Sequence, residues 1–286
     1  MKNVEIVKST GEKQSFSWHK VYRSVKRVGG PSNLATQIAD KLQEEVQPGW
    51  TTLRISRRVR ALLKQRKPSS AIKFNLFWAM TQLGPTGFPF QKYIARVFEA
   101  QGFKVVVEKW AQGKCVRHAV DFIADNGRTV YIGECKYHNT RGIKTNIDSV
   151  LHYFARFSDI QNGSSFTQAR RKKKIIKTML ITNTQFTTKA IKYARCVGQE
   201  LWGWNYPHRQ GLETIIDARK VYPITILPSF RGGRLMQVFS EKGLTLARDV
   251  LDKESYLKKM NLSPKLLSSL QREAHQLFEE KLPKAN

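Results

Sequence analysis

Asp121, Glu134 and Lys136 are the residues whose types and spacing best fit a chemical role. They flank an Asn-Gly pair and lie within runs rich in Val, Ile, Phe and Tyr. Placing two carboxylates and a lysine among apolar residues is unfavourable unless the charges have a partner. Carboxylate oxygens suit Mg²⁺, and a bound metal stabilises charge during phosphodiester hydrolysis. The pattern predicts a metal site that cuts phosphodiesters. The simpler alternative is a strand end beside a solvated strand face.

The Asn126-Gly127 pair predicts how the carboxylates come together, because Asn-Gly between apolar runs is typical of a two-residue hairpin turn. Such a turn would pair Asp125 with Arg128 and place Asp121 opposite Ile132. Asp121 and Glu134 would then be diagonal neighbours, about 7–8 Å apart at the backbone. Side chains alternate along a strand. One face is therefore expected to hold Ala119, Asp121, Ile123, Val130, Ile132, Glu134 and Lys136.

A zinc site is the rival interpretation of the same region. Cys115 and His118, and likewise Cys135 and His138, are spaced as C-x₂-H. Cys135 would face away from Glu134 and Lys136, however, and a continuing strand would separate it from His138. The carboxylate site is therefore favoured, and His118 is expected to be a packed histidine.

The composition points to a folded protein with an anionic partner. Fifty Lys and Arg against 22 Asp and Glu give a net charge of +28, and hydrophobic residues make up 41% of the 286. Such an excess favours nucleic acid as the partner. We expect no membrane segment, since no run approaches about 18 apolar residues. Three scattered cysteines do not form a disulfide framework, and a cytoplasmic location is expected.

Three regions are predicted along the chain, and the fold class is α/β. Residues 1–83 indicate a small α+β unit, a hairpin plus helices. Gly and Pro are dense just after residue 83, which indicates a linker. Residues 84–228 alternate strands with helices, which favours a mixed sheet flanked by helices. Residues 229–286 indicate a short all-α C-terminal region.

Residues 4–83 resemble the ATP-cone, a regulatory nucleotide-binding module. The similarity lies in Val7-Lys8 before Gly11, Phe16 before Lys20-Val21, and Gly49-Trp50-Thr51-Thr52, with Ala71, Phe74, Asn75 and Leu76 later. The resemblance implies ATP or dATP as an allosteric effector. The implied binding residues are Val7, Lys8, Ser9, Gly11, Lys20 and Thr52. Ser9 stands where such modules usually carry Arg, and Gln14 and Ser17 stand where Glu and Asn are common.

Residues 88–228 resemble the Mrr-like restriction endonucleases of the PD-(D/E)XK superfamily. The similarity lies in Phe88-Pro89-Phe90-Gln91, Gly102-Phe103, Asp121, Glu134-Cys135-Lys136 and Thr182-Asn183-x-x-Phe186-Thr187. It implies that Asp121 and Glu134 hold Mg²⁺ or Mn²⁺, with the Cys135 carbonyl a further ligand. Lys136 would position the attacking water. Related enzymes often carry Glu where Gln91 stands, so Gln91 would bind through a metal-bound water.

Basic residues are the expected DNA contacts. Arg141 and Lys144 follow the Glu-Cys-Lys motif closely. Arg170, Arg171, Lys172, Lys173 and Lys174 form a dense run, expected to be a flexible loop that contacts phosphates. The resulting hypothesis is a Mg²⁺-dependent DNA endonuclease that is regulated by ATP or dATP and acts as a homodimer or higher oligomer. The alternative is a non-catalytic, nucleotide-responsive DNA-binding protein on a nuclease-like fold.

Overall fold

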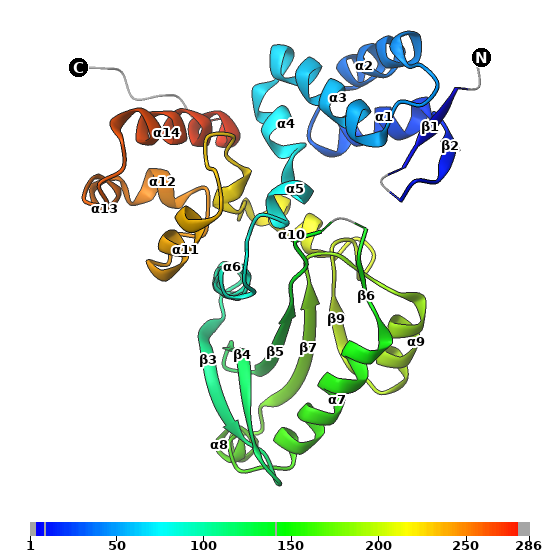
Figure 1. Cartoon of the computed structure of the whole chain (residues 1–286). Coiled ribbons are helices and arrows are strands. Elements are labelled where there is room, and N and C mark those ends of the chain that lie inside the picture. Colours follow the sequence, from blue (N-terminus) through cyan, green and yellow to red (C-terminus); the bar gives the residue numbers. More distant parts are fainter. Residues whose placement is uncertain (1–3, 9, 141, 280–286) are drawn as a thin grey trace. The chain divides into compact units, whose positions relative to one another are not determined.

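The computed structural model describes residues 4–8, 10–140 and 142–279 (Figure 1). The chain forms two compact units. Unit 1 consists of Met1–Ala79, Ile226–Phe230 and Val250–Asn286, and unit 2 of Met80–Thr225 and Arg231–Asp249. In the described part of the chain, no helix is long and apolar enough to cross a membrane.

Unit 1 is a short hairpin with helices, as the sequence predicted. Its elements are β1 (Glu5–Val7), β2 (Lys13–Ser15), α1 (Trp18–Arg27), α2 (Ser32–Glu45), α3 (Thr52–Arg66), α4 (Pro68–Lys73), α5 (Leu76–Met80, whose last residue belongs to unit 2), α12 (Asp249–Asp252, whose first residue belongs to unit 2), α13 (Glu254–Lys258) and α14 (Pro264–Phe278). Ser17 and Thr51 cap α1 and α3 by accepting backbone N–H groups through their side chains. The buried faces of α1, α2 and α3 share one apolar core with Ile6 of β1.

Unit 2 is built on a five-stranded mixed sheet in the order β3-β4-β5-β7-β9. Its strands are β3 (Lys104–Gln112), β4 (Arg117–Asp125), β5 (Thr129–Lys136), β7 (Ile175–Thr182) and β9 (Glu200–Trp202), with β6 (Lys144–Thr145) and β8 (Gln185–Phe186) forming a separate pair. Its helices are α6 (Phe88–Glu99), α7 (Ile147–Gln161), α8 (Thr167–Arg171), α9 (Thr188–Cys196), α10 (Leu212–Arg219) and α11 (Arg234–Glu241). The strands β3, β4 and β5 pair antiparallel, and β5, β7 and β9 pair parallel.

Helices cover both faces of this sheet, which gives unit 2 its layers. On one face, Tyr153 of α7 and Ala190 of α9 pack with Leu180 of β7. On the other face, the Phe98 ring of α6 lies 5.0 Å from the Phe122 ring of β4. The sheet is therefore buried on both sides, as the apolar runs predicted.

The C-terminal residues, predicted to be a helical region at 229–286, carry α11 to α14 and are divided between the two units. In unit 2, Arg96 of α6 donates to the Gly243 carbonyl at 2.7 Å and forms an ion pair with Asp249 at 3.1 Å. In unit 1, Ser69 of α4 donates to Glu279, just after α14, at 2.8 Å. The C-terminal helices thus contact α6 in unit 2 and α4 in unit 1.

The β4–β5 hairpin has a different register from the predicted one. Ile123, not Asp121, is opposite Ile132, and Asp125 pairs with Val130. The turn is longer because the Asn126 side chain accepts the backbone N–H groups of Arg128 and Thr129 at 3.1 and 2.8 Å. The shift of two residues preserves the side-chain faces, because the strand period is two. It makes Asp121 a direct rather than a diagonal neighbour of Glu134.

The predicted single face is interrupted at Asp121. Ile123 packs with Ile132 and Phe157 on the α7 side, while Phe122 lies on the α6 side. Regular alternation would send Val120 toward α6, yet Val120 belongs to the same core as Ile132. Ala119 consequently does not share the face of Ile123. In the ladder of β3 and β4, Asp121 falls opposite Glu108, whose φ is 52°, and this is the local kink that re-aims the strand.

Candidate active site

Asp121 lies where β4 separates from β5. The ladder ends at the pair Phe122 and Gly133, and beyond it the Asp121 Oδ2 accepts the Cys135 backbone N–H at 2.7 Å. Where the two strands separate, the Asp121 side chain thus takes the place of a backbone carbonyl as the acceptor for the Cys135 N–H. This hydrogen bond fixes the Asp121 carboxylate beside the residue that follows Glu134.

Glu134 is a mostly buried carboxylate with few partners. Its side chain is 25% exposed, and Arg156 Nη1 of α7 lies 3.0 Å from its Oε2. That oxygen is buried and has no hydrogen-bond donor in good alignment, so it keeps an ionic neighbour only. Burial, followed by the negative charge of Asp121, raises the pKa of Glu134 to about 7 against the opposing effect of Arg156.

Asp121 shares the same environment. Burial raises its pKa, while the Cys135 backbone hydrogen bond, the Arg156 charge and a hydrogen bond with the Gln91 side chain lower that pKa. The Glu108 charge opposes them and raises the pKa. The structure thus brings the predicted Gln91 of α6 to the predicted Asp121, as a hydrogen-bond partner.

Arg156 and Glu108 are the site residues that sequence reasoning missed. Arg156 lies in the C-terminal half of α7. It contacts Glu134 and the Ala119 carbonyl, which are both far from it in the sequence. No local motif signals such contacts. Glu108 could have been found only from the pairing of β3 with β4, which places it across from Asp121.

Lys136 is the exposed last residue of β5, paired with Thr182 of β7. Its charge lowers the pKa of Glu134, so its ammonium group acts on the same site. The chain after Lys136 is held by Asn183, which accepts the His138 N–H at 2.9 Å and donates to the His138 carbonyl at 2.7 Å. The end of β5 is therefore anchored directly beside Lys136.

The chemistry of this site fits a hard divalent metal. Within the described residues, no group of three or more His, Cys, Asp or Glu is placed to hold a metal. The available ligands are two adjacent carboxylates and the backbone carbonyl of Cys135, and Mg²⁺ accepts such a set because it retains several waters. The buried Glu134 Oε2 already faces the Arg156 guanidinium at 3.0 Å, so a metal ion would share or replace that cation. Burial raises the pKa of the Cys135 thiol well above its usual range, which leaves the sulfur a poor ligand.

The predicted DNA contacts are scattered. Lys144 is exposed in β6, and Arg141 lies outside the described residues. The basic run is divided between a helix and a turn: Arg170 and Arg171 end α8, and Lys172, Lys173 and Lys174 form the turn into β7. Arg170 Nη1 donates to the Gln161 carbonyl at 2.9 Å, and Lys174 forms an ion pair with Asp125 at 2.5 Å.

These internal contacts explain why so basic a run is ordered. The run precedes the first residue of β7, which pairs with the first residue of β5, and Lys136 is the last residue of β5. A span of seven residues at about 3.3 Å each separates the run from Lys136 along the strand. Arg171, Lys172 and Lys173 are exposed there.

The predicted nucleotide-binding residues lie in unit 1. Val7 of β1 donates to the Trp50 carbonyl at 2.9 Å and forms a bridge with Thr51, which places the hairpin beside the start of α3 and Thr52. Lys8 is paired with Glu12 at 2.8 Å. Lys20 lies in α1, Gly11 lies in the turn with φ of 85°, and Ser9 is outside the described residues.

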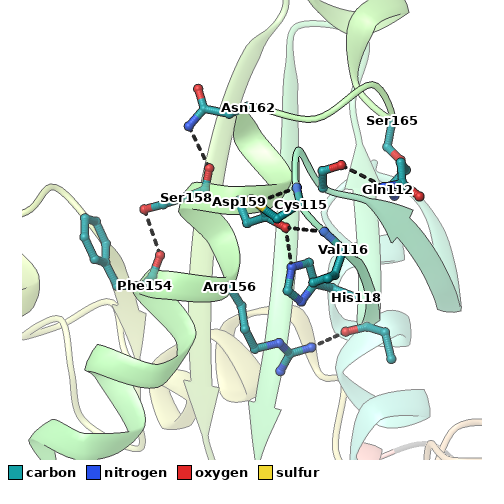
Figure 2. Close-up of polar contacts among 12 residues, drawn as sticks. Gln112, Cys115, Val116, His118, Phe154, Arg156, Ser158, Asp159, Asn162 and Ser165 are labelled. Carbon is teal, nitrogen blue, oxygen red and sulfur yellow. Dashed lines mark hydrogen bonds and ion pairs between the residues drawn. The ribbon is translucent and has the colours of Figure 1, made fainter.

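The β3–β4 turn is held by the carboxylate of Asp159, which lies on α7 three residues after Arg156 (Figure 2). Asp159 accepts the backbone N–H groups of Cys115 and Val116 at 2.8 and 3.2 Å, and lies 2.8 Å from His118 Nε2. The Cys115 and His118 hydrogen bonds lower the pKa of Asp159 strongly. His118 is therefore a structural histidine that faces Asp159.

Sequence and structure comparisons agree on the origin of this fold. The model of the family described as archaeal Holliday junction resolvase (Hjc) matches residues 85–198, and the model described as AF1548-like, C-terminal, matches residues 222–278. An uncharacterized protein of Archaeoglobus fulgidus is 34% identical over 173 residues, which are 60% of this chain and 92% of the relative. This chain belongs to the AF1548-like family.

The solved structures lead to the same family. The crystal structure entitled protein of unknown function AF1548 is 30% identical, with a TM-score of 0.57 over 68% of this chain and 99% of that one. The Hjc match spans Gln91, Asp121, Glu134 and Lys136. The region that resembled the Mrr-like group therefore contains a segment, residues 85–198, that matches the Hjc family model. Neither family match reaches residues 1–79.

Proposed function

We propose that this AF1548-like protein is a divalent-metal-dependent DNA endonuclease that hydrolyses phosphodiester bonds at Asp121, Glu134 and Lys136. One observation carries the proposal. Two mostly buried carboxylates from adjacent strands lie together, and the buried Oε2 of Glu134 faces a cationic group, the Arg156 guanidinium, at 3.0 Å. Two adjacent carboxylates that are mostly buried repel each other, and a bound cation would stabilise their charged forms. The Hjc match over the same residues favours DNA as that substrate.

The roles of the residues follow from their positions. Asp121, Glu134 and the Cys135 carbonyl would hold Mg²⁺ or Mn²⁺, which supplies electrostatic stabilisation of the charge that develops on the phosphate. Lys136, exposed at the end of β5, would orient the attacking water and stabilise the same charge. Gln91 would keep Asp121 oriented through its hydrogen bond. Arg156 would hold Glu134 until the cation binds.

Cleavage of supercoiled plasmid and of a synthetic four-way junction with Mg²⁺ or Mn²⁺ tests this proposal. We expect nicking or cutting by the native chain and loss of at least about 1,000-fold in Asp121→Asn and Lys136→Ala, because each removes several kcal/mol of transition-state stabilisation. Lys177→Ala is the matched control, since Lys177 lies on the neighbouring strand and is paired with Glu200 at 2.6 Å.

Binding without cutting would overturn the nuclease proposal. If the native chain shifts DNA on a gel but leaves it intact with either metal, the DNA-binding alternative replaces it. Equal loss of cleavage in Lys177→Ala would show that the effect is not specific to the site.

Regulation by ATP or dATP, and action as a homodimer, belong to the same proposal. The contact of β1 with the start of α3 supports nucleotide binding, because backbone N–H groups at a helix N-terminus favour phosphate. Two nuclease sites are needed to cut both strands, which supports a dimer. Light scattering and cleavage, each with and without ATP, test both points. Unchanged mass and rate would remove the nucleotide from the proposal.

A further inference from the structure

The β3–β4 hairpin exposes a large aromatic side chain among cations. Trp110 is 64% exposed and Val116 is 57% exposed, the two highest values among the exposed large hydrophobic residues. Lys109, Lys114 and Arg117 are exposed on the same hairpin. An exposed tryptophan in a basic setting is unusual for a surface that contacts only water.

Arg117 and Trp110 form one face. Trp110 pairs with Ala119 and Gln112 pairs with Arg117, so Trp110 and Arg117 are diagonal cross-strand neighbours. The Arg117 guanidinium lies 5.3 Å from the centre of the Trp110 ring. This cation–π contact holds both side chains at the surface, with much of the aromatic ring still accessible.

The hairpin that presents this face is held from behind. The Asp159 carboxylate fixes the turn through Cys115, Val116 and His118 (Figure 2). The Gln112 backbone N–H donates to the Ser165 hydroxyl at 2.5 Å. A Cβ on Gly113 would lie 2.0 Å from Asp159, so only glycine permits this close approach. The exposed face is therefore preorganised.

The face lies near the carboxylate pair. Ala119, the partner of Trp110, precedes Asp121 by two residues on β4, which is about 7 Å along the strand. Ala119 and Trp110 face away from the α7 side, where Arg156 contacts Glu134. Because β3 is the edge strand, a nucleic acid whose phosphate reached Asp121 and Glu134 would contact Trp110 with its neighbouring nucleotides by passing around this edge.

We propose that the face formed by Trp110 and Arg117 is a nucleic-acid contact, where Trp110 stacks on an unpaired base beside the cleavage site and Arg117 contacts phosphate. This proposal rests on DNA as the substrate of the proposed nuclease. Base–aromatic stacking tolerates any sequence but needs a base whose face is free. The substrate class is therefore DNA with unpaired or unstacked bases, as at a branch or fork. Pairing of two copies through the edge strand β3 is less favourable, because their Lys109, Lys114 and Arg117 side chains would repel.

Binding in the Asp121→Asn background tests the contact without cleavage. The probes are a fluorescent forked duplex with unpaired arms and a fully paired duplex of the same length. We expect Trp110→Ala to bind the fork about tenfold more weakly and Trp110→Phe to retain most of the affinity. Val106→Ala is the matched control, since Val106 is an exposed side chain of the same strand, and should bind as the parent does. Arg117→Ala should lower the salt slope of binding by about one.

Several results would overturn the contact. They are unchanged fork binding by Trp110→Ala, equal weakening by Val106→Ala, or an equal loss on the paired duplex. A lower molar mass of Trp110→Ala in light scattering would assign the face to an interface between copies instead. Cleavage separates the two proposals: a native chain that binds but never cuts removes the nuclease, whereas normal fork binding by Trp110→Ala removes only this contact.

Discussion

Helix α7 carries one carboxylate, Asp159, and contacts another, Glu134, and the fold shifts the pKa values of these two groups in opposite directions. Asp159 receives two backbone N–H groups and a histidine, and these hydrogen bonds lower its pKa strongly. Glu134 receives no backbone N–H group in the described structure and is paired with one cation, Arg156, one turn before Asp159 on α7; burial raises the pKa of Glu134 to about 7. The comparison teaches that a carboxylate saturated by the fold acts as structure, whereas one left short of donors is available to a ligand.

The largest effect expected from this comparison concerns stability without metal. At pH 8 in EDTA, Glu134→Gln should raise the free energy of unfolding by up to about 3 kcal/mol, because the folded pKa of about 7 lies well above the ordinary 4.5. The folded state binds the proton more tightly than the unfolded state. Stability of the native chain therefore falls as pH rises from 4.5 to about 7.

Urea unfolding at pH 4 and pH 8 measures this difference. The gain of Glu134→Gln should be present at pH 8 and absent at pH 4, where Glu134 is protonated in both states. A gain that is equal at both pH values would attribute it to packing instead of charge. Asp125→Asn serves as the control on β4, because the Lys174 ion pair lowers the pKa of Asp125.

The second expected effect is on the pH dependence of cleavage. A protonated Glu134 cannot hold a metal, so at subsaturating Mg²⁺ the rate should fall about tenfold for each pH unit below about 7. Arg156 lowers the pKa of Glu134, so Arg156→Gln should move this limb to higher pH. Initial rates from pH 5.5 to 9 measure it. A limb at the same pH in both proteins would contradict the role of Arg156.

The smallest expected effect concerns Asp159, whose carboxylate already has three hydrogen-bond donors. Asp159→Asn should lower the thermal midpoint by a few degrees, because the amide cannot satisfy all three donors that the carboxylate accepts. Cleavage at low temperature should persist. Asp148→Asn, in the first turn of the same helix, is the control. Loss of cleavage without a change in midpoint would place Asp159 in the active site and break the comparison.

The sequence was a good guide to the sheet of unit 2 and a poor one to its details. The apolar runs around Asp121 and Glu134 predicted two paired strands. The observed register differs from the predicted one by two residues. Because the strand period is also two, this shift still leaves Asp121 and Glu134 as neighbours. The basic run was expected to be a flexible loop, but its first two residues end α8 and the other three form the turn into β7, where Arg170 donates to the Gln161 carbonyl and Lys174 pairs with Asp125. Those partners are distant in sequence.

By itself, the sequence determined which residues are the candidates for chemistry. Asp121, Glu134 and Lys136 could be singled out because charges among apolar strand residues are unfavourable without a partner. Only the tertiary structure decided how those charges are tuned. The kink at Glu108, the reach of Gln91 and Arg156, and the buried oxygen of Glu134 all arise from contacts between separate elements. Burial and neighbouring charges set a pKa, and both depend on where the chain folds back on itself.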